Sequence, residues 1–137
     1  MTSASAAFRQ LPQFIRFLAC GGIAAAVNWL SRFGWSLVLP FSAAVLTAYA
    51  TGMVVAFLLF RRFVFDAGEG ALAPQARRFV LVNLLGMAAT WALANLLVLW
   101  WLPAIGWRWH VEAIGHAIAI VAPVVTSWFG HRLLTFR

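Results

Sequence analysis

Three stretches of this chain carry no charged residue and are long enough, or nearly so, to cross a lipid bilayer. Phe41 to Phe60 covers 20 residues, Phe79 to Trp107 covers 29 and Ala113 to Gly130 covers 18. A helix needs about 20 apolar residues to span the hydrocarbon core. Because lipid offers the backbone no hydrogen bonds, such stretches must satisfy their own polar groups as helices. The sequence therefore predicts an all-α integral membrane protein.

A fourth transmembrane helix is predicted ahead of these, from about Ile15 to Leu39. It contains Arg32, which a rise of about 1.5 Å per residue places roughly 24 Å from Arg16, near the far edge of the core. From there the side chain is expected to snorkel outward. Pro40 separates this span from the next one. The composition agrees, since 64% of the residues are hydrophobic and only 9% are charged, against about a quarter charged in soluble domains.

The chain contains the same pattern twice: an Arg-Phe opening, a long apolar hairpin and a basic, aromatic close. Arg16-Phe17 opens the first copy and Arg78-Phe79 the second. Thr90 follows Asn28 by 62 residues, whereas Arg132 follows Arg61 by 71, so the second copy has nine extra residues, near 103–110. This predicts two tandem hairpins in parallel orientation within one membrane domain. Repeat 1 covers about 14–65, a cytoplasmic linker about 66–76, and repeat 2 about 77–136.

The net charge of +7 comes from ten arginines, and these predict the orientation. Cytoplasmic loops retain positive charge, and eight arginines fall on one side of the predicted spans: Arg9, Arg16, Arg61, Arg62, Arg77, Arg78, Arg132 and Arg137. Both termini are therefore expected inside (N-in/C-in). Because the arginines stand at the ends of apolar runs and not on a polar surface, no nucleic-acid partner is expected.

Polar residues within the first and third predicted helices are candidate groove residues. Asn28 and Arg32 are four apart and share a helix face, and Asn28 needs a partner inside the protein at its depth. It either contacts a ligand or makes an interhelical hydrogen bond. Asn83 and Thr90 repeat the theme on the third helix, with the same two interpretations.

The fourth predicted helix opens with Glu112 and His116, again four residues apart, and both are further candidate groove residues. His110 cannot share the face of His116, and Cys20 stands alone, so neither a metal site nor a cofactor is expected. Arg108 or Arg32 is the expected partner of Glu112, and Pro123 indicates a kink or a hinge. No nucleophile–base set, paired carboxylates or glycine-rich phosphate loop occurs, so the chain is not expected to be an enzyme.

The cytoplasmic arginines are candidate phosphate ligands, because guanidinium groups bind phosphate through two parallel hydrogen bonds. A simpler interpretation is the positive-inside rule together with attraction to anionic membrane lipids. The candidates for headgroup binding are Arg16, Arg61, Arg62, Arg78 and Arg132.

Residues from about 14 to 136 resemble the GtrA-like family of small four-span bacterial membrane proteins. The resemblance rests on the segment from Arg16 to Asn28 and on the close from Phe57 to Phe65, with a second copy of the pattern later in the chain. It implies a location in the bacterial cytoplasmic (inner) membrane and a role in cell-surface polysaccharide synthesis. The family often has an acid where this chain has Asn28, and Leu134 replaces the usual aromatic residue of the second close.

The resemblance implies that the chain flips a polyprenyl-phosphate-linked monosaccharide between the leaflets. One alternative is a membrane anchor or chaperone for a partner glycosyltransferase, without transport of its own; a third is a small cation exporter. Expected partners are the polyprenyl-phosphate sugar and membrane lipids. A homodimer or higher oligomer is also expected, because four short helices enclose little space.

Overall fold

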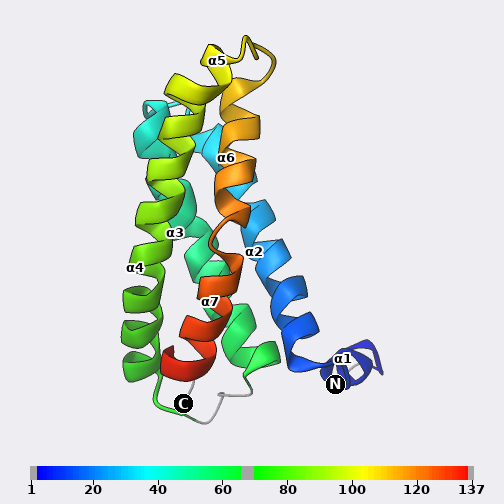
Figure 1. The fold of residues 1–137 in the computed structure, drawn as a ribbon. Coiled ribbons are helices and arrows are strands. Elements are labelled where there is room, and N and C mark those ends of the chain that lie inside the picture. The colour runs from blue at the N-terminus through cyan, green and yellow to red at the C-terminus, as the bar shows by residue number, and fades with distance from the viewer. Residues whose placement is uncertain (1–2, 66–69, 136–137) are drawn as a thin grey trace.

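The computed structural model describes residues 3–65 and 70–135 as an elongated bundle of helices (Figure 1). Within these ranges there are helices and turns and no strand, which confirms the all-α prediction. The elements are α1 (Ser3–Arg9), α2 (Gln13–Trp35), α3 (Phe41–Leu59), η1 (Phe60–Val64), α4 (Leu72–Leu96), η2 (Leu97–Trp101), α5 (Leu102–Ala104), α6 (Val111–Val121), α7 (Val124–Gly130) and η3 (His131–Thr135). Asp66 and Glu69 of the expected linker, and Phe136 and Arg137 after η3, lie outside the described residues.

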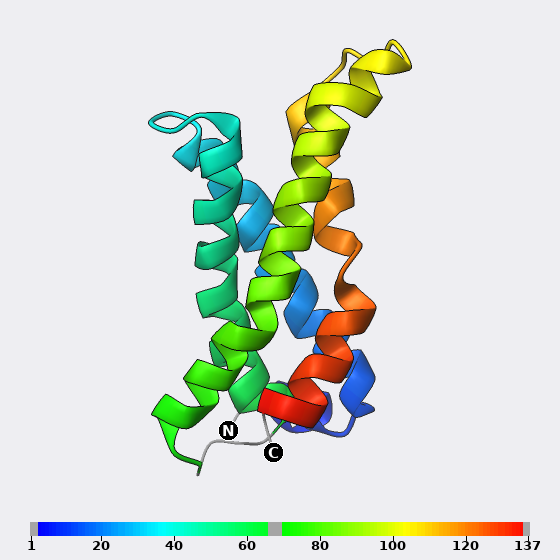
Figure 2. The same cartoon turned by 60° about the vertical axis from the view of Figure 1, so that its left-hand side comes forward.

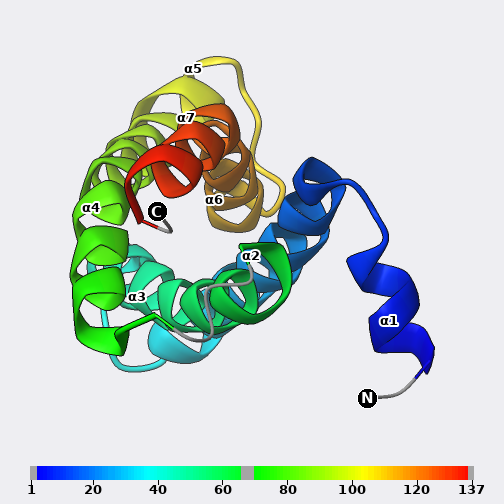
Figure 3. The same ribbon diagram turned by 90° about the horizontal axis from the view of Figure 1, so that it is seen from below.

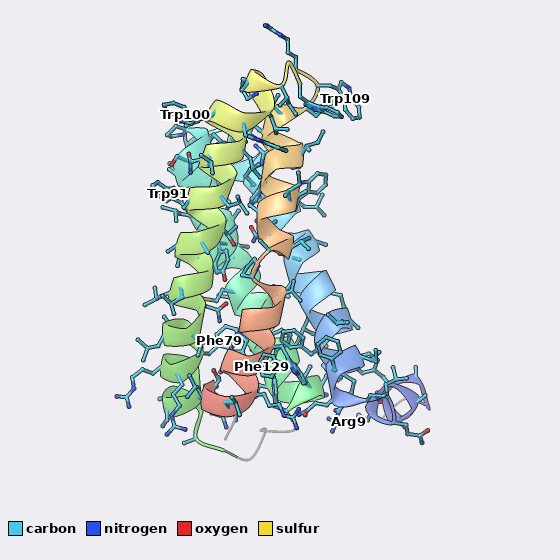
Figure 4. All side chains as sticks on the ribbon, in the orientation of Figure 1. Arg9, Phe79, Trp91, Trp100, Trp109 and Phe129 are labelled. Carbon is cyan, nitrogen blue, oxygen red and sulfur yellow. The ribbon has the colours of Figure 1, made fainter. Side chains whose placement is uncertain are left out.

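Two helical hairpins stand side by side, α2–α3 and α4–α6–α7, while α1 lies apart from them (Figure 3). Three helical stretches are long and apolar enough to cross a membrane: Gln13–Trp35, Phe41–Val64 and Leu72–Ala104. We call the end of the bundle with α1 and η3 the termini end, and the end with the turns at 36–40 and 105–110 the loop end (Figure 1). Trp91, Trp100 and Trp109 lie toward the loop end, and Arg9 and Phe79 toward the termini end (Figure 4).

α4, which begins the third expected span, starts earlier than the sequence predicts. It begins at Leu72, inside the stretch expected as a linker, because Pro74 lies in its first turn, where a missing N–H is tolerated. The 33 residues of Leu72–Ala104 measure about 50 Å at 1.5 Å per residue, more than the roughly 30 Å of a bilayer core. The second hairpin accordingly projects beyond the first at the loop end (Figure 2).

The segment expected as the fourth span consists of two shorter helices, and the break between them falls at Pro123, where the sequence indicated a kink or a hinge. The chain leaves helical geometry between α6 and α7, at Pro123, so α6 is a shorter apolar helix of 11 residues. Proline lacks the N–H that would bond to the carbonyl of Ala119, and its ring collides with that turn. The break is visible between the orange and red ribbons in Figure 1.

The duplication predicted from the sequence has a direct counterpart in three dimensions. Trp29 Nε1 donates to the carbonyl of Ala113 at 2.9 Å, and Trp91 Nε1 donates to Ser42 Oγ at 2.8 Å. Trp91 follows Trp29 by 62 residues and Ala113 follows Ser42 by 71, the two offsets that relate the repeats. Each hairpin thus donates a tryptophan N–H to the other at positions related by the repeat offsets, in one case to a backbone carbonyl and in the other to a side-chain hydroxyl.

The termini end contains a buried cluster built from equivalent residues of the two repeats. Phe17 packs on Phe60 at 4.8 Å between ring centroids, and Phe79 stacks on His131 at 4.5 Å. Phe60 and His131 open the π-helices η1 and η3, lie 71 residues apart and face each other at 5.5 Å. This aromatic core holds the two hairpins together below the polar residues described next.

Candidate functional site

A groove of about 250 Å³ runs between α2 and the broken helix α6–α7, with α3 behind it. We call it the lateral groove. Its rim includes Leu18 and Val121, which are 41% and 67% exposed on the outer surface of the bundle. Its polar lining residues come from five elements: Asn28, Tyr49, Asn83, Ser127 and His131. The rest of the lining is apolar, so these five side chains are isolated polar groups, and polar groups at membrane depth need partners.

Asn28 is held in place by close packing between two helices. It is only 5% exposed and lies where α2 and α3 approach closely, because a Cβ on Gly52 would stand 2.7 Å from the Cβ of Asn28. The Asn28 Oδ1 atom is buried and has no donor among the described residues. An unpaired buried acceptor is costly, and this one lines the lateral groove, where a ligand hydroxyl would satisfy it.

The other side of the groove is a chain of hydrogen bonds. Tyr49 Oη donates to Asn83 Oδ1 at 3.2 Å. Asn83 Nδ2 donates to the carbonyl of Phe79 at 2.9 Å and lies 3.1 Å from His131 Nε2. On the other side of the ring, His131 Nδ1 lies 3.1 Å from Thr135 Oγ1. A continuous chain of polar contacts therefore runs along this side of the groove, from Tyr49 to Thr135.

The helix break at Pro123 is stabilised from the neighbouring helix. Thr90 Oγ1 donates to the carbonyl of Ala119 at 3.4 Å, the carbonyl that proline leaves without its usual N–H partner. A second groove, of about 480 Å³, lies on the other side of α7, against α4. Tyr49, Asn83 and Ser127 line both grooves. The short helix α7 therefore has open space on two sides.

A second polar group lies at the loop end. Arg32 Nη1 donates to Glu112 Oε2 at 3.1 Å and to Ser36 Oγ at 3.2 Å, which identifies the partner of Glu112 as Arg32. Arg32 is only 2% exposed and stacks over the ring of Phe33. Its bonds direct the guanidinium toward the loop end, where an acid on the other hairpin holds it. His116 is fully buried. Within the ranges the structure describes, no three His, Cys, Asp or Glu residues gather as a metal would require.

The arginines of the termini end divide into two sets. Arg16 Nη1 donates to the carbonyl of Phe63 at 2.6 Å, and Arg61 Nη2 donates to that of Gly70 at 2.8 Å. Arg16 thereby satisfies a carbonyl that the end of η1 leaves without an intrahelical donor. The side chains of Arg62, Arg78 and Arg132 are exposed, so they remain accessible to a headgroup.

Comparison with known protein families identifies the family of this chain. The sequence model described as GtrA/DPMS, transmembrane domain, matches residues 16–136. The chain belongs to this family. No curated protein and no solved structure matches it.

Membership in the GtrA/DPMS family implies the handling of polyprenyl-linked sugars for surface polysaccharide synthesis. Members are generally not catalytic enzymes. With its long apolar helices, the chain is a multi-pass integral membrane protein.

The structure divides the six predicted groove residues into separate groups. Asn28 and Asn83 line the lateral groove, while Arg32, Glu112 and His116 gather at the loop end. Thr90 lies outside the lining of either groove.

Sequence reasoning missed Tyr49, Ser127 and the buried position of His131. Tyr49 is the only tyrosine of the chain and stands in the middle of an uncharged span, a signal that could have found it. Because His131 directly precedes Arg132, the sequence alone suggests an interfacial position for it. Only the repeat offset, which matches His131 to the buried Phe60, indicates that it faces the core.

Proposed function

We propose that this protein moves a polyprenyl-phosphate-linked monosaccharide across the cytoplasmic membrane of a bacterium, from the inner to the outer leaflet. The observation that carries the proposal is the lateral groove: a largely apolar surface that carries five polar side chains and no Asp, Glu or Arg, with exposed apolar residues on its rim. A lipid-linked sugar has matching parts. Its polyprenyl tail can remain in the bilayer beside Leu18 and Val121 while the sugar occupies the groove.

The size of the groove suits a single sugar. At about 30 Å³ per water molecule, 250 Å³ is the space of roughly eight waters. A hexose, with about a dozen non-hydrogen atoms, is of a size that this space can hold. Asn28 Oδ1 would accept from a sugar hydroxyl, and the rings of Phe17 and Phe60 line the same space.

In this proposal α6 and α7 together form the fourth span, and both termini face the cytoplasm. The termini end carries most of the arginines, in agreement with the positive-inside rule. Arg62, Arg78 and Arg132 would then meet the phosphate at the inner leaflet, with Arg16 and Arg61 holding the backbone beneath them. A homodimer and a glycosyltransferase that supplies the lipid-linked sugar are the proposed partners.

The proposal is tested in proteoliposomes, by measuring how fast polyprenyl-phosphate glucose becomes accessible in the opposite leaflet. The wild-type protein is expected to move the lipid faster than protein-free vesicles do. Asn28→Leu removes the free acceptor and is expected to slow movement at least tenfold. The matched control is Asn95→Leu, which removes the same amide from α4, where Asn95 bonds to the carbonyl of Trp91 outside the groove.

Two results would count against translocation. Folded wild-type protein that moves no lipid-linked hexose or pentose would favour the anchor or chaperone role, and the next step would be to search for a bound glycosyltransferase. Equal slowing by Asn28→Leu and Asn95→Leu would remove the lateral groove as the path. A cation exporter has little support, because Glu112, the carboxylate nearest the membrane, already pairs with Arg32.

A further inference from the structure

Three ionisable side chains from both hairpins meet at the loop end, outside the lateral groove. Arg32 of α2 is 2% exposed and bonds to Glu112 of α6, and His116 lies one helical turn beyond Glu112 with no exposed surface. We call Arg32, Glu112 and His116 the loop-end triad.

The fold does not need charges at this place, and the molecule itself provides the comparison. The repeat offsets match Arg32 to Ala94, Glu112 to Phe41 and His116 to Val45. Val45 and Ala94 are buried in one apolar cluster, with Phe41 packed against it.

The same structural position is therefore filled by apolar side chains in one half of the bundle and by ionisable ones in the other. Burying an ion pair offers little stability over well-packed apolar residues, and ionisable groups at membrane depth are usually functional. The triad is thus better explained by a ligand than by packing.

The hydrogen-bonding groups of the triad indicate what that ligand is. Arg32 makes both of its side-chain bonds through Nη1, while its buried Nε has no acceptor among the described residues. Both ring nitrogens of His116 are also buried and lack a partner within the described chain. An Arg Nε–H and a His N–H are donors. One of these unsatisfied donors belongs to the guanidinium itself and the other to the imidazole of His116. Together they favour an anion with several acceptor oxygens.

We propose that the loop-end triad is a binding site for a phosphate group, with Arg32 and His116 as its ligands. In the ligand-free state Glu112 pairs with the guanidinium group of Arg32. Its side chain is 53% exposed, so it can turn into water when phosphate takes its place. The paired nitrogens of a guanidinium match two phosphate oxygens. The site lies at the opposite end of the bundle from the arginines proposed for the inner leaflet.

The proposal is tested by equilibrium binding to the purified full chain in nanodiscs, with intrinsic tryptophan fluorescence as the readout. Trp29 bonds to Ala113, next to Glu112, and so reports on the site. Inorganic phosphate and a polyprenyl phosphate are the two probes. Glu112→Gln removes the competing carboxylate and is expected to tighten binding at least tenfold. Arg108→Gln, on an exposed arginine of the same end, is the control and is expected to change nothing.

A second variant copies the apolar half of the molecule into the triad: Arg32→Ala, Glu112→Phe and His116→Val together. It is expected to fold, with a Tm within a few degrees of wild type, and to lose saturable binding. If it does not fold, Glu112→Gln/His116→Val is compared with Glu112→Gln, and at least tenfold weaker binding is expected. Unchanged affinity in Glu112→Gln, or saturable binding by the folded triple variant, overturns the proposal.

The two probes identify the source of the phosphate. Saturable binding of polyprenyl phosphate alone assigns a lipid headgroup, and binding of both probes assigns the phosphate group itself; either supports the site. This site does not depend on the proposed translocation, and binding to it is measured without any movement of lipid. A protein that binds phosphate here but moves no sugar would refute translocation alone, and the reverse result would refute this site alone.

Discussion

Asn28 has a fixed position in the groove because Gly52 has no side chain. A methyl group at residue 52 would stand 2.7 Å from Asn28 Cβ and 2.9 Å from the carbonyl oxygen of Ala24, which is backbone and cannot move aside. Gly52→Ala is therefore expected to destabilise the protein by about 1–3 kcal/mol through overpacking. It should also displace Asn28 and slow translocation. Thermal unfolding in detergent and the vesicle assay measure the two effects.

The control for this prediction is Gly34→Ala, in the same helix as Asn28. A Cβ at Gly34 meets no atom within 4 Å, so only helix propensity changes, by up to about 1 kcal/mol in the stabilising direction. Equal Tm values for Gly52→Ala and wild type would show that α2 and α3 are less closely packed than described.

Single residues of the site were predictable where a helix face alone determines them. Asn28 and Asn83 are polar groups deep in apolar helices, and depth follows from position in the sequence. The bonds that Tyr49 and His131 make to Asn83 join α3, α4 and η3, and a helix-by-helix reading of the sequence does not place those elements side by side. The sequence left Arg108 and Arg32 as alternative partners of Glu112, and only the structure identifies Arg32, 80 residues away in the chain.

Among the helices, the break in the fourth span is the feature that opens the groove. Pro123→Ala supplies an N–H for the carbonyl of Ala119 and removes the ring clash, so α6 and α7 are expected to join. A proline in a helix interior costs about 3 kcal/mol. The variant should therefore be more stable than wild type by about 1–3 kcal/mol and should translocate several-fold more slowly. Unfolding and transport measured on the same preparation test this opposite pair of effects.

Pro74→Ala is the matched control, because Pro74 lies in the first turn of α4, where its missing N–H has no partner to lose. Small changes in both measurements are expected there. A Pro123→Ala protein that is less stable than wild type would show that the break is held by more than the proline and the bond from Thr90.

The positions of the helices followed from composition, since uncharged runs of about 20 residues leave few alternatives. The ends of the helices did not follow from composition. Whether Pro123 kinks a helix or breaks it depends on neighbours such as Thr90, which takes over the free carbonyl of Ala119. The π-helices η1 and η3 likewise had no local signal beyond the repeated basic close.

For the molecule as a whole, the reciprocal tryptophan hydrogen bonds connect the two hairpins. Trp29→Phe and Trp91→Phe each remove one such bond while keeping an aromatic ring. Each is expected to cost about 1 kcal/mol, and the double variant should show the sum because the bonds lie on opposite sides of the repeat axis. Denaturant titration of the four proteins measures this. A large cost for one tryptophan and none for the other would mean that the repeats are energetically unequal here.

The parallel repeat also determines where each loop lies relative to the membrane. In a Cys20→Ala background, Leu37→Cys and Ile105→Cys place exposed thiols in the two turns of the loop end, while Ala4→Cys and Ala71→Cys place them at the termini end. With both termini in the cytoplasm, a membrane-impermeant maleimide is expected to label the first pair in intact spheroplasts and the second pair only after lysis. The inverse pattern would reverse the orientation and place the arginine-rich end, and its proposed phosphate contacts, outside. Labelling of only one member of either pair would contradict two parallel hairpins, because equivalent positions in parallel repeats must face the same side.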